Sequence, residues 1–573
     1  MSVKNVTPMH HILDIQDFSV RFGDTHAVNH ISLKLPRGKT LGIVGESGSG
    51  KSVTALSIMQ LLPSGALTGG KILFQPDAGT APANLLELSE QELTRVRGKS
   101  ISMVFQEPMT SLNPVFKCGI QVTEAVQHHK NVGFKEARSE VPHLFEQVKL
   151  PDPERIFNAY PHQISGGQKQ RVMIAMAMSC QPDVMIADEP TTALDVTVQR
   201  SILELLCELK ESAGLSMIFI SHDLGVISEI CDEVAVMFRG DLVEEGAVQE
   251  VFKYPKHAYS RGLVACRPDP DRQVKRLPTV SDFLENRTFD AAVIGREEIL
   301  TRRQGLYTQK PLLSAEAVSV RYPRRKNWYG KVVEWTNAVD EVSFDIYPGE
   351  TFGLAGESGC GKTTLGRTIA RLTQGFSGNV TYNGHLVSSL SEAHFKPFRK
   401  DIQVVFQDPY SSLNPRMTIG AAIEEPMEVH KLHGSKQARR EKTMELLRTV
   451  GLQPEHYQRY PHEFSGGQRQ RICLARALAP EPRLLICDEM VSALDVSVQA
   501  TILNLLQDLQ AQFGLTYLFI SHDLSVIRQM CDRLMVMKSG KTDATGFPDE
   551  LYSNPPTDYI KKLIEAIPGR RSE

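Results

Sequence analysis

Short apolar runs alternate with longer stretches of helical period along the chain. Residues 41–44 and 352–355 are apolar, and each run leads through glycine-rich residues into a helical stretch, at 53–62 and at 364–372. Short apolar runs bounded by turn residues are typical of strands buried in a parallel sheet, whereas the longer stretches have the spacing of helices. The pattern therefore predicts an α/β fold, and it predicts it twice.

Further runs add strands and helices to each half. Strand-like runs lie at 12–15, 18–21, 184–187 and 217–220, and the last two have counterparts at 484–487 and 517–520. The stretch 441–450 has the spacing of an amphipathic helix and belongs to a region that we expect to project from the α/β core as a helical subdomain. The first half has ten extra residues between its glycine-rich segment and Gln106, around 76–83, where Asp, Gly, Thr and Pro favour a surface loop.

Polar landmarks repeat at a fixed distance. The pairs that lie 300 residues apart are Ser165 and Ser465, Asp188 and Asp488, and His222 and His522. A repeat of this length indicates a duplicated domain rather than a short solenoid repeat. We therefore predict one domain at 10–265 and another at 313–565, each long enough to bury its own core. The segment between them, 266–312, starts with Arg, Asp and Pro and predicts a linker partly packed on its neighbour.

Charge and hydropathy exclude some classes of protein. The chain has 64 basic and 67 acidic residues and a net charge of −3, which leaves no extended basic field for a nucleic acid backbone. No apolar run reaches the ~18 residues of a membrane helix, and residues 1–11 lack the hydrophobic core of a signal peptide. We therefore expect a cytosolic chain, with any membrane spans supplied by other chains.

Two segments match the phosphate loop G-x-x-x-x-G-K-[ST] in full, each between a predicted strand and a predicted helix. Glycines let backbone N–H groups curl around phosphates at a helix N-terminus, where the helix dipole favours negative charge. Lys51 and Lys362 are expected to reach the β- and γ-phosphates, and the hydroxyls of Ser52 and Thr363 to ligate Mg²⁺. The other nucleotide-binding positions of the loops are Gly45, Ser47, Gly48 and Gly50, and Gly356, Ser358, Gly359 and Gly361.

The nine cysteines have no metal-binding spacing, and Cys266 stands alone after the first domain. We therefore predict no iron–sulfur cluster and expect mostly buried, reduced thiols. Cys360 is the exception, because it lies inside the second phosphate loop. An alkylating reagent or oxidant at this thiol could block nucleotide entry. A helix N-terminus can lower the pKa of a thiol, but the sequence does not establish this for Cys360.

Additional motifs indicate which family of phosphate-loop proteins the chain resembles. Each half continues with Val-Phe-Gln, Ser-Gly-Gly-Gln, an apolar strand ending in Asp-Glu, Ala-Leu-Asp and Ile-Ser-His-Asp. This set resembles the ATP-binding-cassette (ABC) family over nearly the whole chain. The strings at 105–114 and 460–471 are similar to the dipeptide, oligopeptide and nickel importer branch. The fused double cassette resembles the ATPase subunits of glutathione importers and of microcin-type peptide importers, the first more closely because of residues 488–495.

The resemblance implies an α/β fold with two tandem phosphate-loop ATPase domains. Each domain would have a RecA-like α/β core, an antiparallel β subdomain and a helical signature subdomain. The signature of each half is expected to complete the ATP site of the other half, which makes the chain an intramolecular cassette dimer. The signature residues are Ser165, Gly166, Gly167 and Gln168, and Ser465, Gly466, Gly467 and Gln468, and the Ala-Leu-Asp carboxylates are Asp195 and Asp495. Phe22 and Tyr322 lie where the family places an aromatic ring that stacks on adenine, although either also fits a strand core.

Side chains at strand ends are expected to carry the hydrolysis of ATP. The two carboxylates of each Asp-Glu pair alternate in direction, so their roles differ. The aspartate is expected to hold Mg²⁺ through its water shell, and the glutamate to orient or deprotonate the attacking water. The histidine is expected to sense the γ-phosphate, and the glutamine to ligate Mg²⁺ and contact the water. These residues are Asp188, Glu189, His222 and Gln106, and Asp488, Glu489, His522 and Gln407.

Two positions depart from the family pattern. Ile164 replaces the usual leucine before the first signature, and Met490 replaces the usual proline after the second acid pair. Neither change removes a catalytic group, so we predict two competent sites.

Three functions fit a double cassette. The favoured one is the ATPase of an importer for peptides or peptide-like solutes, in which ATP with Mg²⁺ closes the two cassettes and hydrolysis reopens them. An exporter motor is disfavoured by the branch-specific strings, and a soluble cassette pair acting on ribosomes or DNA by the absence of a long charged linker or a zinc module. The implied partners are two transmembrane permeases and, through them, a separate solute-binding protein, with no nucleic acid. The implied location is peripheral, at the cytoplasmic face of the bacterial inner membrane.

Overall fold

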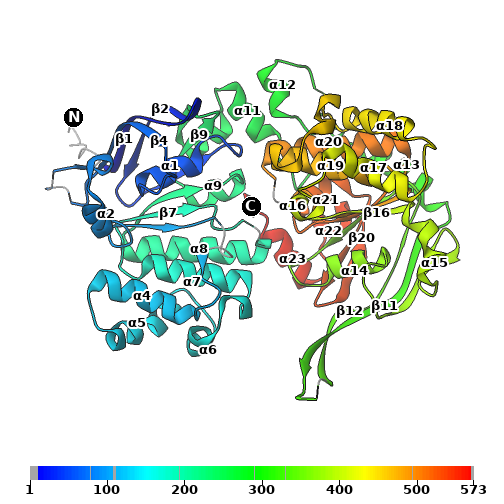
Figure 1. Ribbon diagram of the computed structural model, residues 1–573, viewed down its shortest axis with the longest axis horizontal. Helices are drawn as coiled ribbons and strands as arrows, with labels where there is room; N and C mark the ends of the chain where they lie inside the picture. Colours follow the sequence, from blue (N-terminus) through cyan, green and yellow to red (C-terminus); the bar gives the residue numbers. More distant parts are fainter. Residues whose placement is uncertain are drawn as a thin grey trace.

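The computed structural model describes residues 11–77, 79, 81–106, 111–192, 194–289, 291–329, 331–492 and 494–569. The predicted domain start at residue 10 lies outside these residues, as do residues 78 and 80 of the predicted surface loop. The same holds for the parts of the family-like strings at 107–110, 193 and 493. Figure 1 shows two lobes side by side, one from each half of the chain.

The first half contains two sheets. An antiparallel sheet with the order β2-β1-β4-β5 consists of β1 (His11–Phe22), β2 (Thr25–Pro36), β4 (Ala66–Phe74) and β5 (Ala83–Asn84). A larger sheet with the order β10-β9-β3-β8-β7-β6 consists of β3 (Thr40–Val44), β6 (Ile101–Val104), β7 (Val184–Asp188), β8 (Ser216–Ile220), β9 (Glu233–Phe238) and β10 (Asp241–Ala247). Of the strands described in this larger sheet, only β10 pairs antiparallel. β3, β7 and β8 are buried at every position, as expected for parallel strands covered on both faces.

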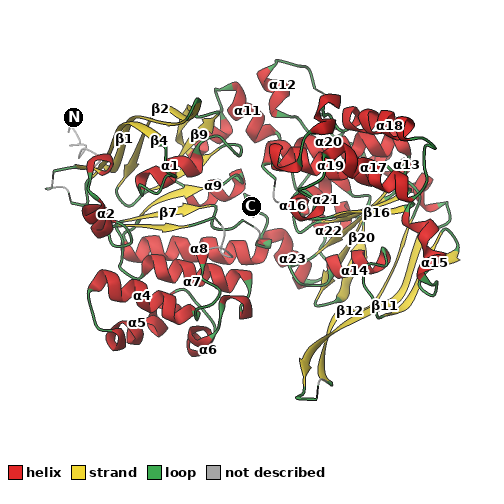
Figure 2. Cartoon of the chain, in the orientation of Figure 1, coloured by secondary structure: helices red, strands yellow, loops and turns green. Residues whose placement is uncertain are grey.

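Helices cover the larger sheet and form a separate group beside it. The helices of the first half are α1 (Lys51–Ile58), α2 (Glu90–Val96), α4 (Cys118–Lys130), α5 (Phe134–Gln147), α6 (Pro153–Asn158), α7 (Gly166–Met178), α8 (Val196–Ala213), α9 (Leu224–Ile230), α10 (Val248–Lys253) and α11 (Ala258–Ala265). Helices α4, α5 and α6 pack on one another, and α4 and α5 also pack on α7 (Figure 2). This group is the helical subdomain that the sequence predicted.

The second half repeats this architecture. Its antiparallel sheet, in the order β12-β11-β14-β15, consists of β11 (Leu313–Lys326), β12 (Val332–Ile346), β14 (Phe376–Tyr382) and β15 (His385–Leu386). Its larger sheet, in the order β16-β17-β18-β13-β19-β20, consists of β13 (Thr351–Ala355), β16 (Ile402–Val405), β17 (Leu484–Asp488), β18 (Thr516–Ile520), β19 (Arg533–Lys538) and β20 (Lys541–Gly546). Its helices are α14 (Lys362–Ile369), α15 (Glu392–Phe395), α16 (Pro409–Ser412), α17 (Ile419–Val429), α18 (Lys436–Thr449), α19 (Gly466–Leu478), α20 (Val496–Phe513), α21 (Leu524–Met530), α22 (Pro548–Ser553) and α23 (Asp558–Glu565).

The predicted strands are confirmed, with differences at the element ends. The expected runs at 12–15 and 18–21 form one strand, β1, in which the register shifts between Gln16 and Ser19. Asp17 has a φ of 48° at this irregularity, so the ladder bends there without ending. The helix after the first phosphate loop ends at Ile58 instead of residue 62, and Gln60 with φ 51° turns the chain away.

The segment predicted as a linker is partly helical and docks on the second cassette. It contains α12 (Val280–Leu284) and α13 (Arg296–Tyr307). The buried amide of Asn504 accepts from the backbone N–H of Leu277 at 3.0 Å and donates to its carbonyl at 2.8 Å. Arg302 makes two hydrogen bonds to Asp532, at 2.5 and 2.9 Å. The first cassette is therefore tied to the second through a packed segment of chain.

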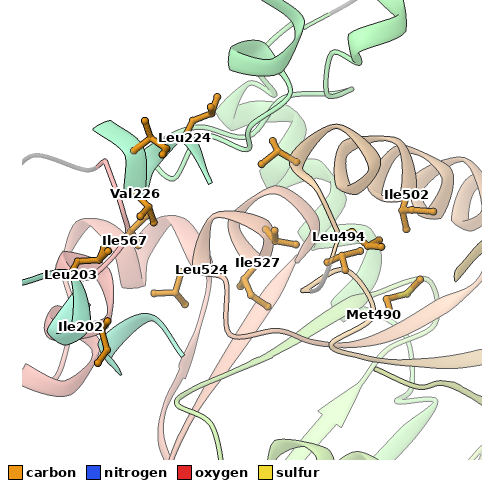
Figure 3. Close-up of a cluster of buried hydrophobic side chains, with 14 of the residues drawn as sticks. Ile202, Leu203, Leu224, Val226, Met490, Leu494, Ile502, Leu524, Ile527 and Ile567 are labelled. Atoms are coloured by element: carbon orange, nitrogen blue, oxygen red, sulfur yellow. The ribbon is translucent and has the colours of Figure 1, made fainter. Parts of the chain in front are cut away.

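A hydrophobic cluster joins the two halves. Figure 3 shows Ile202 and Leu203 of α8 and Val226 of α9 in the same cluster as Leu524 of α21 and Ile567, which follows α23. The C-terminal tail extends this contact, because the N–H of Gly569 donates to Glu229 at 2.8 Å. Arg267 donates to the carbonyl of Pro568. The end of the second cassette thus lies against the first.

Among the residues that the structure describes, none of the helices is long and apolar enough to cross a membrane.

Candidate active sites

Each phosphate loop closes around its own lysine. The ammonium of Lys51 donates to the backbone oxygens of Gly45 and Glu46, at 2.8 Å each. Lys362 makes the matching pair of bonds at 2.7 and 2.9 Å. Both lysines are buried. Such an ammonium can leave the neutral carbonyls and bind a phosphate oxygen, because a hydrogen bond to a charged oxygen is stronger.

The glycines of the loop are required by close backbone contacts. Gly45 has φ 153°, and a Cβ there would lie 2.2 Å from the carbonyl oxygen of Met237. Gly50 has φ 101°, and its Cβ would lie 2.6 Å from the carbonyl of Ala27. The second loop has the same two contacts at its equivalent glycines. Any larger residue would therefore push the loop out of its curled conformation.

The first phosphate loop already binds a negatively charged group. The backbone N–H of Ser47 donates to Oδ2 of Asp495, a residue of the other half, at 2.8 Å. A carboxylate oxygen thus lies where the loop is expected to hold phosphate. This contact shows that the N–H of Ser47 is oriented to donate to an anion.

A hydroxyl and an aspartate lie together at each site. Ser52 donates to Asp188 at 3.1 Å, and Thr363 donates to Asp488 at 2.8 Å. Burial raises the pKa of Asp188 to about 6, against the lowering effect of the bond from Ser52, and burial also raises the pKa of Asp488. Within the described residues, Oδ2 of Asp488 is buried and has no hydrogen-bond partner.

These oxygen ligands fit Mg²⁺, which takes few protein ligands and completes its shell with phosphate oxygens and water. In the described part of the chain, no cluster of three or more His, Cys, Asp and Glu side chains could hold a metal ion.

The two glutamates take an unusual backbone conformation. β7 and β17 end at the aspartates, and the next residues, Glu189 and Glu489, have φ values of 47° and 46°. Positive φ is uncommon for a residue with a side chain and is found at functional sites. The aspartate and the glutamate of each pair have different partners: Asp188 accepts from Ser52, whereas Glu189 accepts from Gln106 and Thr192.

Three side chains of the first half contact Glu189. Its Oε2 accepts from the amide of Gln106 at 2.9 Å and from the hydroxyl of Thr192 at 2.9 Å, and Nδ1 of His222 lies 3.4 Å away. Burial raises the pKa of Glu189, but the hydrogen bonds and the charge of His222 outweigh it and lower the pKa to about 2. Burial lowers the pKa of His222, yet Glu189 reverses this and raises it. The glutamate is therefore held as a carboxylate that accepts hydrogen bonds.

The second site differs in its contacts to the glutamate. Glu489 accepts from Gln407 at 3.0 Å, and His522 lies 3.3 Å away. Lys362 lies 3.7 Å from its other oxygen. Ser492, the counterpart of Thr192, donates to the backbone carbonyl of Glu489 instead of its side chain. The structure thus brings the predicted Gln, Glu and His together in both halves. The additional contact to the glutamate carboxylate comes from Thr192 in the first half and from Lys362 in the second.

The signature residues open helices α7 and α19. Ser165 and Gln168 form a capping box, and Ser465 and Gln468 form an identical one. Ser165, Gly166, Ser465 and Gln468 are exposed. Within the described residues, the hydrogen bonds of these signatures are those of the caps, and none joins a signature to the opposite phosphate loop. The predicted completion of each site by the opposite signature remains a prediction.

The segments after the Asp-Glu pairs do cross between the halves. Besides the contact of Asp495 with Ser47, Thr197 at the start of α8 donates to Glu357 of the second phosphate loop at 3.0 Å. Asp195 caps α8 through Val198. A cavity of about 110 Å³ between the halves is lined by both His222 and His522. The catalytic ends of the two cassettes therefore face one another.

The predicted adenine-stacking residues differ in exposure. Phe22 is partly buried against the core of the antiparallel sheet. Tyr322 occupies the same place in β11 and is 44% exposed. Only the second ring presents a large free surface.

Sequence reasoning missed two tyrosines that hold the phosphate loops. The hydroxyl of Tyr259 on α11 accepts from the N–H of Glu46 at 2.9 Å, and that of Tyr559 on α23 accepts from the N–H of Glu357 at 3.2 Å. The two tyrosines have the same separation as the other paired landmarks, so the spacing of the duplication could have found them.

The structure argues against a reactive thiol at Cys360. Its side chain is 6% exposed, and burial raises the pKa of the thiol. The nearby charge of Lys362 acts in the opposite direction but does not compensate for burial. The thiol packs under the phosphate loop instead of facing a nucleotide.

Comparison with protein families and curated proteins identifies relatives across the chain. Residues 28–192 and 339–492 match the family model described as ABC transporter. The glutathione import ATP-binding protein of Salmonella paratyphi A is 46% identical over 552 residues, which cover 95% of this chain and 86% of that protein. The protein of the same name from Escherichia coli K12 is 45% identical over 571 residues, covering 97% of this chain and 89% of its own length.

Solved structures of single cassettes are also similar. A dimeric ATP-binding cassette in a post-hydrolysis state with ADP and phosphate is 28% identical and covers 41% of this chain and 98% of its own, with a TM-score of 0.38. A component of an ABC transporter complex from Clostridium perfringens is 30% identical and covers 43% and 91%, with a TM-score of 0.37.

Proposed function

Because the chain belongs to the ABC transporter family, as a tandem ABC ATPase, we propose that it powers the import of glutathione or a related peptide-like solute. The relatives that support this proposal are named for glutathione import and align with almost the whole chain. The observation that carries it is the presence of two complete sets of ATPase residues whose phosphate loops contact the opposite half. One polypeptide thus provides both halves of an importer's motor.

Two phosphate loops bind ATP in this proposal. Lys51 and Lys362 leave their loop carbonyls and bind the β- and γ-phosphates, while loop N–H groups hold the phosphate chain. Ser52 and Thr363 would ligate Mg²⁺ together with Gln106 and Gln407, and Asp188 and Asp488 would hold it through its water shell. The bound Mg²⁺ supplies charge neutralisation on the phosphates. Phe22 and Tyr322 stack on adenine.

Hydrolysis uses the carboxylate that each site keeps charged. Glu189 and Glu489 orient the attacking water and accept its proton. His222 and His522 contact the γ-phosphate, and each lies within ion-pair distance of its glutamate, at 3.4 and 3.3 Å. In the structure the amide N–H groups of Gln106 and Gln407 donate to these same glutamates, and the oxygen of each amide is the atom that would ligate Mg²⁺.

Closure of the halves completes each site. Ser165, Gly166, Gly167 and Gln168 bind the ATP held by the second phosphate loop, and Ser465, Gly466, Gly467 and Gln468 bind that held by the first. The carboxylate of Asp495 leaves Ser47 when phosphate takes its place. The exposed capping serines can then offer their hydroxyls and helix N-termini to the γ-phosphate. Hydrolysis removes this link and the halves separate.

The implied partners are membrane proteins. Two permeases carry the solute, and the helical subdomains receive their cytoplasmic helices. A separate solute-binding protein delivers the cargo to the permeases. The chain acts as a peripheral subunit on the cytoplasmic side of the inner membrane.

Purification from mild detergent tests the partners, and uptake tests the cargo. We expect two polytopic permeases to be recovered with the tagged protein, and radiolabelled glutathione uptake to be lost when both Lys51 and Lys362 are replaced by alanine. A tagged chain that brings down ribosomes or repair factors and no permease overturns the proposal. Normal glutathione uptake in the lysine variant overturns the assignment of cargo.

A further inference from the structure

The two antiparallel sheets differ by an insertion at one hairpin. The carbonyls of Ala27 and Ala338 face the last glycine of their respective phosphate loops, so the two alanines are equivalent. Ala27 is five positions after Phe22, whereas Ala338 is sixteen positions after Tyr322. The β11–β12 hairpin is therefore eleven residues longer than the β1–β2 hairpin. Figure 1 shows its end projecting away from the rest of the second cassette.

The inserted hairpin exposes large aromatic side chains. Trp328 is 93% exposed, Tyr329 86% and Trp335 55%, with Val333 at 58% beside them. Each of these side chains loses the benefit of burial in the isolated protein. Exposed apolar groups gathered in one place, unlike scattered ones, mark an interaction surface.

The same hairpin carries a strong positive charge. The basic residues between 321 and 334 are Arg321, Arg324, Arg325, Lys326 and Lys331, and the acidic residue is Glu334. Glu334 pairs with Arg324 at 2.7 Å, and for Arg321, Arg325 and Lys331 the structure records no ion pair within the described residues. The chain as a whole has a net charge of −3, so this positive charge is local to the hairpin.

We propose that the β11–β12 hairpin is a second membrane contact, which binds anionic lipid headgroups through its basic residues and inserts Trp328 and Tyr329 into the interface. Tryptophan and tyrosine are the side chains that favour the level of the headgroups, and clustered Lys and Arg are attracted to anionic lipid. This proposal rests on the proposed function for placing the chain at a membrane. It adds a lipid contact to the contacts with permeases.

The protein contains its own probe for this contact. Its only two tryptophans, Trp328 and Trp335, both lie in the hairpin. Intrinsic tryptophan emission of the purified full chain therefore reports on this element alone. The measurement needs neither ATP nor permeases, so its failure is distinct from a failure of the importer assignment.

Titration with vesicles tests the proposal. With vesicles in which phosphatidylcholine is mixed with anionic phosphatidylglycerol, we expect the emission maximum to shift to shorter wavelength and the protein to float with the vesicles. With phosphatidylcholine alone, or in salt of about 0.5 M, both effects should largely disappear. Replacing Arg324, Arg325 and Lys331 by alanine should lower partitioning at least about tenfold, and Trp328→Ala with Tyr329→Ala should lower it while Trp335 still reports.

A matched control removes three exposed lysines elsewhere. Lys34 and Lys71 lie on the antiparallel sheet of the first cassette and Lys310 precedes β11, and all three are exposed. Their replacement by alanine should leave partitioning unchanged. Equal binding of the hairpin variant and this control overturns the proposal, as does the absence of any shift with anionic vesicles. A shift that appears with a single-stranded oligonucleotide or with ATP, but not with vesicles, also overturns it.

Discussion

Glu189 and Glu489 combine a left-handed backbone, partial burial and contacts to both Gln and His, and these features define their expected role. Replacing both by glutamine keeps their shape and removes the proton acceptor. We expect turnover to fall at least about 100-fold, with ATP retained and the cassettes closed. Phosphate release measures the first effect, and nucleotide retained through gel filtration measures the second. Each single replacement should leave partial activity, and a double variant that hydrolyses ATP at the original rate would falsify the general-base assignment.

Thr192 and Ser492 predict unequal sites. The hydroxyl of Thr192 bonds to the Glu189 carboxylate, whereas that of Ser492 bonds to a backbone carbonyl. Thr192→Ala should therefore lower turnover several-fold at the first site, and Ser492→Ala should have little effect at the second. ATP turnover of each variant is measured with the glutamate of the other site replaced by glutamine, so that only one site hydrolyses ATP. Thr192→Ser should restore the rate, and equal effects of the two alanines would contradict the difference.

Cys360 shows where residue types alone were not sufficient. The motif placed the thiol at a helix N-terminus, which favours a lowered pKa, but did not reveal that the side chain packs inward. We expect iodoacetamide to label Cys360 slowly in the folded protein. Cys180, which is less buried, serves as the internal reference, and mass spectrometry compares the two. Faster labelling of Cys360 than of Cys180 would show that the thiol is accessible and would contradict its burial under the loop.

At the level of elements, strands were predicted better than the segment between the domains. Runs such as 184–187 and 484–487 became β7 and β17 because buried parallel strands are uniformly apolar. Residues 266–312 have no such pattern. Their structure depends on partners in the second cassette, such as the amide of Asn504 on Leu277. Local sequence does not record partners that lie in a different domain of the chain.

Asn504→Leu tests that docking. It leaves the buried N–H and C=O of Leu277 without partners, which should weaken local docking by about 2 kcal/mol. Hydrogen exchange at the Leu277 amide should then be about 30-fold faster. Glu204, which occupies the equivalent position of the first half and is exposed, provides the control, and Glu204→Leu should leave exchange at Leu277 unchanged. Unchanged exchange in Asn504→Leu would show that the rest of the segment holds itself in place.

At the level of the whole molecule, the duplication predicted two cassettes but not how they meet. The constant spacing between landmarks identified equivalent residues, and the family resemblance implied that the halves work as a dimer. The contact made by the C-terminal tail was not foreseen, because Ile567 and Pro568 continue a helix end with no motif of their own. In the structure this tail joins the apolar cluster between the halves (Figure 3). This apolar contact holds the halves together, which raises their effective concentration for closure.

Gly225→Ala tests this tether with a single methyl group. A Cβ at Gly225 would lie 2.4 Å from the guanidinium of Arg267 and 2.7 Å from the carbonyl oxygen of Pro568, so the tail must move away from α9. We expect a larger radius of gyration in nucleotide-free solution and a weaker apparent affinity for ATP, because closure then has to bring the halves together. Gly305→Ala is the control, since that glycine also lies in a helix and a Cβ there meets open space. If both variants scatter alike and bind ATP alike, the tail does not hold the cassettes together, and the other contacts between them, such as the docked segment around Leu277, are sufficient.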